Sequence, residues 1–250
     1  MGKIIGIVSG KGGVGKTTVC SGLAFALASQ GKKVIAIDGD IGLKNLDILL
    51  GMSDGTAYDL TDILANRCQI SKAVQVHPNF SNLHFISASQ TASAEDMEAR
   101  AFANLCRYLR GFYEFVLIDA PAGLGHGFKN IIGCCDECIV VATSDLTSIR
   151  DAQKTSAYVS SVDGLTPYLL LNKINPQMIS RGYLQNIDDI IDSVSLPLIG
   201  MLPCDDKLVV YSNRGVPLTS TKSICARPMM NIASRLAGVS VPLDKYFRKK

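Results

Sequence analysis

The stretch Ser9-Gly10-Lys11-Gly12-Gly13-Val14-Gly15-Lys16-Thr17-Thr18 decides the fold of this chain. It satisfies the pattern G-x-x-x-x-G-K-[ST] between a predicted strand and a predicted helix, which is the context that a phosphate-binding loop requires. Its glycines let successive backbone N–H groups converge on a phosphate, and the following helix presents its positive end to the same anion. The stretch therefore predicts a site for the phosphates of a nucleotide.

Each polar side chain of the loop has a predicted role. We expect Lys16 to neutralise β- and γ-phosphate oxygens, Thr17 to place its hydroxyl on Mg²⁺, and Thr18 to cap the helix or contact a phosphate further back. Lys11 is a second lysine, at a position where the pattern asks for nothing in particular. Because an unpaired ammonium is costly in a closed site, we expect Lys11 to meet another phosphate or a carboxylate. The alternative is a solvated lysine on the outer side of the loop.

Carboxylates follow two further predicted strands. Residues 34–37 lead into Asp38 and Asp40, and residues 115–118 lead into Asp119. In doubly wound sheets the carboxyl edge holds the ligand, and Mg²⁺ prefers oxygen ligands, often through its waters. We expect Asp119 to accept a hydrogen bond from a metal-bound water, Asp40 to orient the attacking water, and Asp38 to contribute to the same magnesium site.

Short apolar runs alternate with longer amphipathic stretches along the chain, and this alternation is typical of a parallel sheet. The predicted strands span residues 3–9, 33–38, 83–87, 114–119, 137–143, 167–172 and 197–202, and the predicted helices span 16–30, 94–110, 148–162, 182–193 and 221–237. Glycines at the expected left-handed ends of helices are Gly31, Gly111, Gly164 and Gly238. We predict an α/β fold of the P-loop NTPase type, a doubly wound, mostly parallel sheet with helices on both faces, over residues 1–238, followed by a short basic tail at 239–250.

Composition excludes several classes of protein. Of 250 residues, 47% are hydrophobic and 19% are charged, which excludes a largely disordered chain. A net charge of +3 is too mild to signal nucleic-acid binding by itself. No stretch approaches the roughly 18 consecutive apolar residues of a membrane span, and no cleavable leader is recognisable. We therefore expect a cytoplasmic protein with reduced cysteines.

The loop at residues 11–18 resembles the deviant phosphate loop of the MinD/ParA family of dimerising ATPases. The resemblance extends over nearly the whole chain, up to about Gly238, through the stretches at 38–47, 127–130, 148–152, 172–176 and 198–203. It implies the doubly wound fold, ATP and Mg²⁺ as ligands, and an ATP hydrolase that works as a homodimer.

The resemblance also implies roles for single residues. Lys11 would reach across a nucleotide-sandwich dimer to the partner's phosphates, Asn172 would contact adenine, and Asp151 resembles an acidic position on the surface where dimer and regulators meet. The alternative for Asp151 is an ordinary solvated helix residue. Asp40 falls in the first switch, residues 119–123 in the second. The expected ATP-binding residues are Gly10, Lys11, Gly12, Gly13, Val14, Gly15, Lys16, Thr17, Thr18 and Asn172, and the expected catalytic residues are Lys11, Lys16 and Asp40.

Family members use the ATP-bound dimer to hold a membrane and recruit a division inhibitor. The resemblance therefore implies a MinC-type inhibitor, a MinE-type or polar topological factor, and a peripheral position on the inner face of the cell membrane, with septum placement as the function; nucleic-acid binding is not expected. One alternative is a ParA-like or flagellar-placement ATPase, which would bind DNA in a salt-sensitive way. A less favoured alternative is an iron–sulfur reductase, because Cys135 and Cys138 form a CxxC; one such pair with no second pair nearby is weak evidence for a metal, and packed thiols are the ordinary explanation.

The end of the chain departs from the family pattern, in which an amphipathic helix follows a short linker. Here only a few aromatic and basic residues follow the last predicted helix, and at an anionic surface each basic residue would contribute about 1 kcal/mol. These residues are Tyr246, Phe247, Arg248, Lys249 and Lys250. So short a segment makes a poor helix by itself, so a minimal anchor and a solvated tail both stay open. Gly125-His126 is a second departure, since an acidic residue followed by a polar one is usual there.

Overall fold

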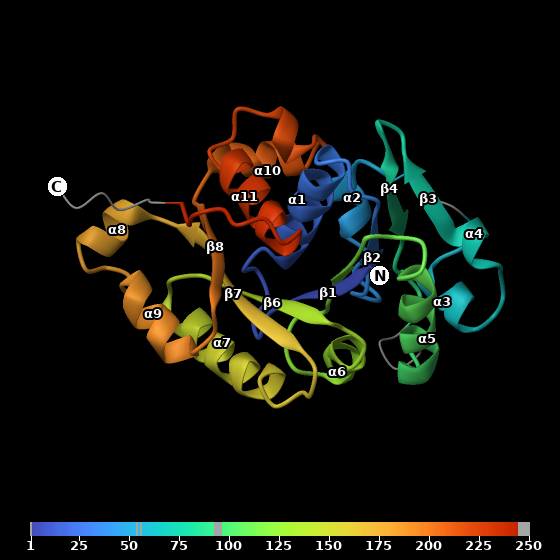
Figure 1. Ribbon diagram of the computed structural model, residues 1–250, viewed down its shortest axis with the longest axis horizontal. Helices are drawn as coiled ribbons and strands as arrows, with labels where there is room; N and C mark the ends of the chain where they lie inside the picture. The colour runs from blue at the N-terminus through green and yellow to red at the C-terminus, as the bar shows by residue number, and fades with distance from the viewer. Residues whose placement is uncertain (1, 54, 56, 93–96, 245–250) are drawn as a thin grey trace.

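Eight strands form a single sheet within the residues that the computed structural model describes, which are 2–53, 55, 57–92 and 97–244. The strands are β1 (Lys3–Val8), β2 (Val34–Asp38), β3 (Val74–His77), β4 (Phe80–Ile86), β5 (Phe115–Asp119), β6 (Glu137–Ala142), β7 (Thr166–Ile174) and β8 (Leu198–Pro203). Their order across the sheet is β3-β4-β2-β5-β1-β6-β7-β8 (Figure 1). Neighbouring strands run parallel, except that β3 pairs with β4 in the antiparallel sense.

Helices cover both faces of this sheet. They are α1 (Lys16–Ser29), α2 (Leu46–Leu50), α3 (Leu60–Leu64), α4 (Ile70–Ala73), α5 (Ala99–Leu109), α6 (His126–Ile132), α7 (Leu146–Val159), α8 (Pro176–Ser180), α9 (Ile187–Val194), α10 (Asp206–Ser212) and α11 (Ala226–Leu236), with a 3₁₀ helix η2 (Leu218–Ser220). In Figure 1, α1, α2 and α11 lie on one side of the sheet, and α6, α7 and α9 lie on the other. The predicted doubly wound α/β fold is confirmed.

The strands are apolar on both faces because both faces are covered, as in other parallel sheets. On β1, Ile4 and Val8 enter a hydrophobic cluster beneath α5, α6 and α7, which we call the α6-side cluster. Ile5 and Ile7 point the other way, into a cluster beneath α1 and α11. All four side chains are at most 3% exposed. Successive side chains thus enter hydrophobic clusters on opposite faces of the sheet. Polar side chains are therefore accommodated at the ends of the strands.

The sequence-based elements differ from the observed ones in specific places. Strand β3 was not predicted, because a four-residue strand with Gln75 and His77 in it carries little hydrophobic pattern. The short helices α2, α3, α4, α6, α8 and α10 were missed for a similar reason, since each is too short for a 3.6-residue repeat to show. Gly31, Gly164 and Gly238 have the expected positive φ, but Gly111 does not, because the turn after α5 stays right-handed at Arg110.

The described part of the predicted tail is attached to α11. Arg235 donates from Nε to the Val241 carbonyl at 2.9 Å, and Asn231 donates to the Asp244 carboxylate at 2.9 Å. The residues expected to contact a membrane lie outside the described residues, and that expectation stays a prediction; they are Tyr246, Phe247, Arg248, Lys249 and Lys250. No helix in the described ranges has both the length and the apolar character needed to cross a membrane.

Phe25 offers a test of this packing, because it joins the helix after the phosphate loop to β3 and β4 at one edge of the sheet. Its side chain is 1% exposed, and its ring centroid lies 5.3 Å from that of His77 and 5.7 Å from that of Phe80. We expect Phe25→Ala to lower the free energy of unfolding by about 3–5 kcal/mol in urea denaturation. Phe112, which is 55% exposed, is the matched control, and Phe112→Ala should cost less than about 1 kcal/mol. Equal losses in the two variants would contradict this account of the core.

Candidate functional site

The phosphate loop lies between the end of β1 and the start of α1, at the carboxyl edge of the sheet. Gly13 and Gly15 have φ values of 80° and 97°, which side chains with a Cβ rarely adopt. Gly15 is also the residue before the first turn of α1, and no side chain caps that helix. The N–H groups of the first turn, which includes Thr17 and Thr18, are therefore directed at the loop without a side-chain acceptor. This geometry suits an anion such as a phosphate.

Two side chains at the end of β7 hold the loop from the other side. The amide of Asn172 donates to the Val14 carbonyl at 2.8 Å, and Nζ of Lys173 donates to the Gly13 carbonyl at 2.8 Å. A Cβ on Gly15 would collide with the Asn172 amide, so the loop can pack this closely only with glycine there. The contact between Asn172 and adenine stays a prediction.

Sequence reasoning missed Lys173. The residue has a φ of 55°, in the left-handed region, and this backbone turn aims its side chain back over the loop. Its position directly after Asn172 at a strand end was a usable signal, because polar residues at the carboxyl ends of these strands face the ligand edge. The left-handed conformation of a lysine, however, cannot be read from the sequence.

Lys11 forms contacts within its own chain. Its Nζ lies 3.2 Å from Oδ1 of Asp145 and 2.6 Å from Oγ1 of Thr147, both at the start of α7. Burial raises the pKa of Asp145, but hydrogen bonds from Thr143, Thr147, the Ser148 N–H and Lys11 outweigh that effect and hold the pKa well below its usual range. In this structure a carboxylate therefore meets Lys11, and its reach to a partner's phosphates stays a prediction. Asp145 itself was not predicted.

The start of the loop packs against α7. A Cβ on Gly10 would lie 2.6 Å from the Asp151 carbonyl and 2.8 Å from the Thr155 hydroxyl. The Asp151 side chain is 32% exposed, and Nζ of Lys154 lies 3.8 Å from its carboxylate. Asp151 thus lies on a helix that touches the phosphate loop, and its predicted role toward regulators stays a prediction.

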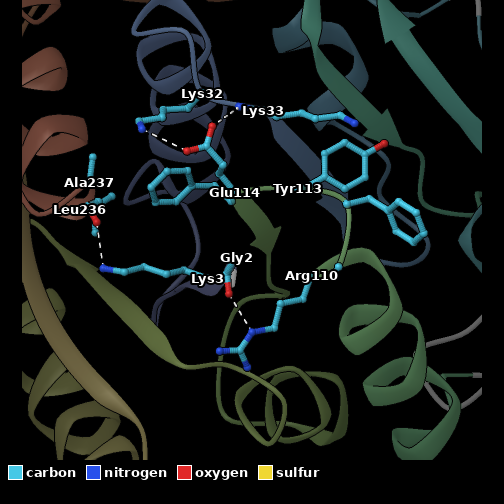
Figure 2. Close-up of a pocket in the computed structure, with 12 residues that line it drawn as sticks. Gly2, Lys3, Lys32, Lys33, Arg110, Tyr113, Glu114, Leu236 and Ala237 are labelled. Atoms are coloured by element: carbon cyan, nitrogen blue, oxygen red, sulfur yellow. Dashed lines mark hydrogen bonds and ion pairs between the residues drawn. The ribbon is translucent and has the colours of Figure 1, made fainter.

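Two cavities show which end of the sheet is suited to a nucleotide. One of about 270 Å³ is lined by Lys11, Gly13, Asp145 and Lys173, directly over the loop. Another of about 620 Å³ lies at the opposite, amino end of the strands (Figure 2). There, as Figure 2 shows, the basic side chains are already used by the chain: Lys3 donates to the Leu236 carbonyl, Lys32 pairs with Glu114, and Arg110 donates to the Gly2 carbonyl. The first cavity is therefore the candidate site.

Asp38 and Asp119 lie side by side beneath the loop. They are register partners on β2 and β5, and they are 0% and 1% exposed. The Asp38 carboxylate accepts three backbone hydrogen bonds of 3.1 Å, from the N–H groups of Asp40, Asn45 and Leu46. Burial raises the pKa of Asp38 to about 6 in spite of these bonds. In this structure Asp38 thus organises the loop that carries Asp40, and its predicted contribution to magnesium stays a prediction.

Asp119 is less well compensated by hydrogen bonds than Asp38. Burial raises its pKa to about 7, the negative charge of Asp38 adds to that rise, and the Thr17 hydroxyl and the charge of Lys16 oppose it. Its Oδ1 is buried and has no hydrogen-bond partner. The pKa of Asp40 is also raised by burial, again against the charge of Lys16. The structure thus brings Lys16 and Thr17, at the start of α1, close to Asp40 and Asp119, and the roles predicted for these four residues stay predictions.

The donor set fits a magnesium ion that arrives with a nucleotide. Asp119 Oδ1 is an orphaned buried acceptor beside the Thr17 hydroxyl, and hard oxygen donors suit Mg²⁺. Across the described ranges, no group of three or more His, Cys, Asp or Glu side chains could hold a metal ion unaided. Phosphate oxygens and water would therefore have to complete the shell. Among the described residues, the CxxC at Cys135 and Cys138 belongs to no such group either.

Comparison with known proteins gives a family-model match to two thirds of the chain and relatives that cover nearly all of it. A family model described as an AAA domain matches residues 2–167. The septum site-determining protein MinD of Synechocystis sp. is 37% identical over 244 residues, which are 97% of this chain and 92% of that protein. A chain of the MinC:MinD cell division protein complex of Aquifex aeolicus is 33% identical with a TM-score of 0.90, covering 98% of this chain and 100% of that one. MinD of Pyrococcus horikoshii complexed with Mg-ADP is 29% identical with a TM-score of 0.85, covering 94% and 96%.

The raised pKa of Asp119 has a measurable consequence for stability. Because its folded pKa of about 7 lies above the ordinary value of 3.8, the folded chain holds a proton that the unfolded chain has lost between these values. Its contribution to stability is therefore fully present below the unfolded pKa and is lost as pH rises through the folded one. We expect Asp119→Asn to raise the free energy of unfolding, without nucleotide, by on the order of 2 kcal/mol at about pH 8, with the gain shrinking toward about pH 4.

Urea denaturation across this pH range tests that expectation. The matched control is Asp163→Asn, because Asp163 is exposed and lies outside the site. It should leave the pH profile unchanged. An Asp119→Asn variant that is less stable than the unmodified chain at the alkaline end would contradict the electrostatic account.

Proposed function

This chain belongs to the MinD family of septum site-determining proteins, and we propose that it is a Mg²⁺-dependent ATPase whose ATP-bound homodimer binds the membrane surface and sets the division site. The chain has the P-loop NTPase fold of that family and takes ATP with Mg²⁺. The observation that best supports hydrolysis is the buried Asp119 carboxylate, with one oxygen unpartnered beside Lys16 and Thr17.

The loop residues bind and orient the triphosphate. The N–H groups of residues 10–18 and the positive end of α1 face the phosphates, and the Lys16 ammonium balances their charge. Mg²⁺ supplies positive charge to the phosphate oxygens when it is bound, and the Thr17 hydroxyl and, through water, Asp119 are the groups that would hold it. Asn172 and Lys173 keep the loop carbonyls of Val14 and Gly13 turned away from the anion.

Asp40 is the residue we assign to orienting the attacking water. It lies on the segment that the Asp38 carboxylate fixes through three backbone hydrogen bonds, so its carboxylate is held at the same edge as Lys16. Asp38 acts in this scheme as the residue that positions the first switch. Asp38 ends β2 and Asp40 follows it directly. Loss of the γ-phosphate therefore changes the contacts of residues 39–46.

Lys11 links nucleotide binding to dimerisation. In the single chain its pair with Asp145 joins side chains that are 41% and 44% exposed. Exposed ion pairs contribute roughly 0–1 kcal/mol, so this contact can be exchanged at little cost. A phosphate held inside a dimer is a stronger partner, because a charge-assisted bond gains when water is excluded. We therefore assign Lys11 to the phosphates of the second subunit's ATP.

Membrane and partner contacts follow from the dimer. Two tails on one dimer bind a surface with a much higher effective affinity than one, without any new contact. The Aquifex aeolicus relative is in a complex named MinC:MinD, and a MinC-type division inhibitor is the partner we propose here. A MinE-type or polar topological factor would stimulate hydrolysis from the α7 surface that includes Asp151. The protein would work at the inner face of the cell membrane.

Two lysine variants separate nucleotide binding from dimerisation. We expect Lys16→Ala to weaken ATP binding by about 100-fold or more, because a charge-assisted phosphate contact is lost. Lys11→Ala should keep ATP binding within about tenfold but stay monomeric with ATP and Mg²⁺. Isothermal titration and light scattering after size exclusion measure the two properties. Lys72→Ala, on the exposed face of α4, is the control and should bind and dimerise normally. A wild-type protein that stays monomeric at saturating ATP would contradict the proposal.

The tail is tested by sedimentation with anionic liposomes in the presence of ATP, ADP or no nucleotide. We expect pelleting with ATP, stronger by about 100-fold in apparent affinity than with ADP, because dimerisation joins two weak contacts. Deletion of residues 245–250 should abolish it while leaving ATP-dependent dimerisation intact. Liposomes of neutral lipid are the control for charge. Equal pelleting of the deletion variant would remove the tail from the proposal, and no pelleting under any nucleotide would remove the membrane.

A further inference from the structure

His77 connects the edge strand β3 to α2, the helix that follows the first switch. Its side chain is 3% exposed, and its ring packs against Phe25 of α1 and Phe80 of β4, with ring centroids 5.3 Å and 5.4 Å away. Both contacts are edge-on, at interplanar angles of 88° and 63°, so the two rings fix the orientation of the imidazole. The proposed ATPase chemistry does not use this buried side chain.

Both ring nitrogens of His77 form hydrogen bonds. Nδ1 accepts a bond from the Asn79 N–H at 3.1 Å, because a backbone N–H can only donate. Nε2 lies 3.1 Å from the Leu50 carbonyl, which can only accept, so Nε2 carries the proton and donates it. Burial holds the pKa of His77 below its ordinary value, although the bond to the Leu50 carbonyl opposes that effect. The ring is therefore neutral, in a single tautomer.

The carbonyl that accepts from His77 belongs to the last residue of α2. The last four carbonyls of a helix have no partner inside the helix, and a buried one needs a donor from elsewhere. Leu50 is 0% exposed, and its hydrogen bond with His77 is buried. The imidazole thus supplies the donor that the end of α2 requires.

The start of α2 is held by Asp38. Oδ2 of this carboxylate accepts from the N–H groups of Asn45 and Leu46, and Oδ1 accepts from the N–H of Asp40, each at 3.1 Å. One carboxylate therefore ties α2 to Asp40, the residue that we assign to orienting the attacking water. Side chains from two strands, β2 and β3, hold the two ends of a five-residue helix.

We propose that His77 is a positioning residue for hydrolysis: it fixes the end of α2 and so keeps Asp40 in place. The inference rests on the proposed function. A helix of five residues has little stability of its own, so its place depends on the contacts at its ends. When the contact at Leu50 is lost, α2 shifts, and the bonds that join α2 and Asp40 through Asp38 loosen with it.

The binding of ATP is independent of this contact. The phosphate loop is held from the other side, by Asn172 and Lys173 at the end of β7. The printed contacts of His77 are instead with Phe25, Phe80 and the backbone of residues 50 and 79. Loss of the His77 hydrogen bonds should therefore slow hydrolysis and leave the affinity for ATP unchanged.

Two substitutions separate the hydrogen bond from the packing. His77→Phe keeps an aromatic ring against Phe25 and Phe80 but removes both hydrogen bonds, whereas His77→Gln keeps an N–H donor for the Leu50 carbonyl. We expect His77→Phe to lower kcat by about tenfold and to leave the Kd for ATP, measured by isothermal titration, within about twofold. His77→Gln should restore kcat to within about threefold of the unmodified chain.

Hydrogen exchange measures the position of α2 without any reference to activity. In the nucleotide-free protein, amides of residues 45–52 should exchange about tenfold faster in His77→Phe, and at close to the normal rate in His77→Gln. His84→Phe is the matched control, because His84 lies on β4 with its ring 5.2 Å from that of Tyr113. It should change neither the exchange nor kcat. Circular dichroism establishes that each variant is folded.

The tautomer of His77 in the unmodified chain tests the geometry even if a variant does not fold. Long-range proton–nitrogen NMR spectra at about pH 7 should show a neutral ring protonated at Nε2. A proton on Nδ1, unchanged exchange in His77→Phe, or faster exchange with normal kcat would each overturn the proposal. An unmodified chain that hydrolyses no ATP would contradict the proposed function, and exchange at residues 45–52 would still decide whether His77 holds α2.

Discussion

The burial of two neighbouring carboxylates, Asp38 and Asp119, is the constraint on which the rest of the site depends. They are register partners at the ends of β2 and β5, and burial raises the pKa of both. A folded chain tolerates such groups only if backbone donors or a ligand compensate them. For Asp38 the donors are N–H groups of residues 40–46, whereas Asp119 keeps one oxygen without a partner. Burial of the Asp119 carboxylate lowers the free energy of unfolding, and binding of a ligand that carries a cation offsets this loss.

The fold supplies the rigidity that this arrangement requires. β1 lies between β5 and β6, so the phosphate loop emerges beside Asp119, and β7 is close enough for Asn172 and Lys173 to reach the loop carbonyls. Both faces of these strands are packed, so a strand cannot shift by one residue without exposing apolar side chains. The switch segments, in contrast, are attached to the strand ends by a few hydrogen bonds. In one of them the Gly39 N–H donates to the Asp119 carbonyl at 2.9 Å. Rigid strands with loosely attached loops suit a site that must respond to one phosphate.

The sequence predicts the parts of this molecule that depend on local pattern. The glycine-rich loop, the central parallel strands and the carboxylates at their ends follow from residue spacing and from apolar runs. The contacts that depend on folding do not: Lys11 meets Asp145 across 134 positions, and Lys173 reaches Gly13 through a left-handed backbone.

The pair between Lys11 and Asp145 explains how a single chain can keep a lysine ready for a second one. The Asp145 carboxylate also accepts hydrogen bonds from Thr143, Thr147 and the Ser148 N–H, so it stays compensated when Lys11 leaves. Lys11 in turn is well exposed, so its departure leaves no buried charge behind. Under the proposed function, dimerisation therefore depends on how much better a phosphate binds Lys11 than Asp145 does, because a ligand shifts an equilibrium only by its differential affinity for the two states. ATP has a γ-phosphate that Lys11 can bind, and ADP does not. The bound nucleotide therefore determines whether the dimer forms.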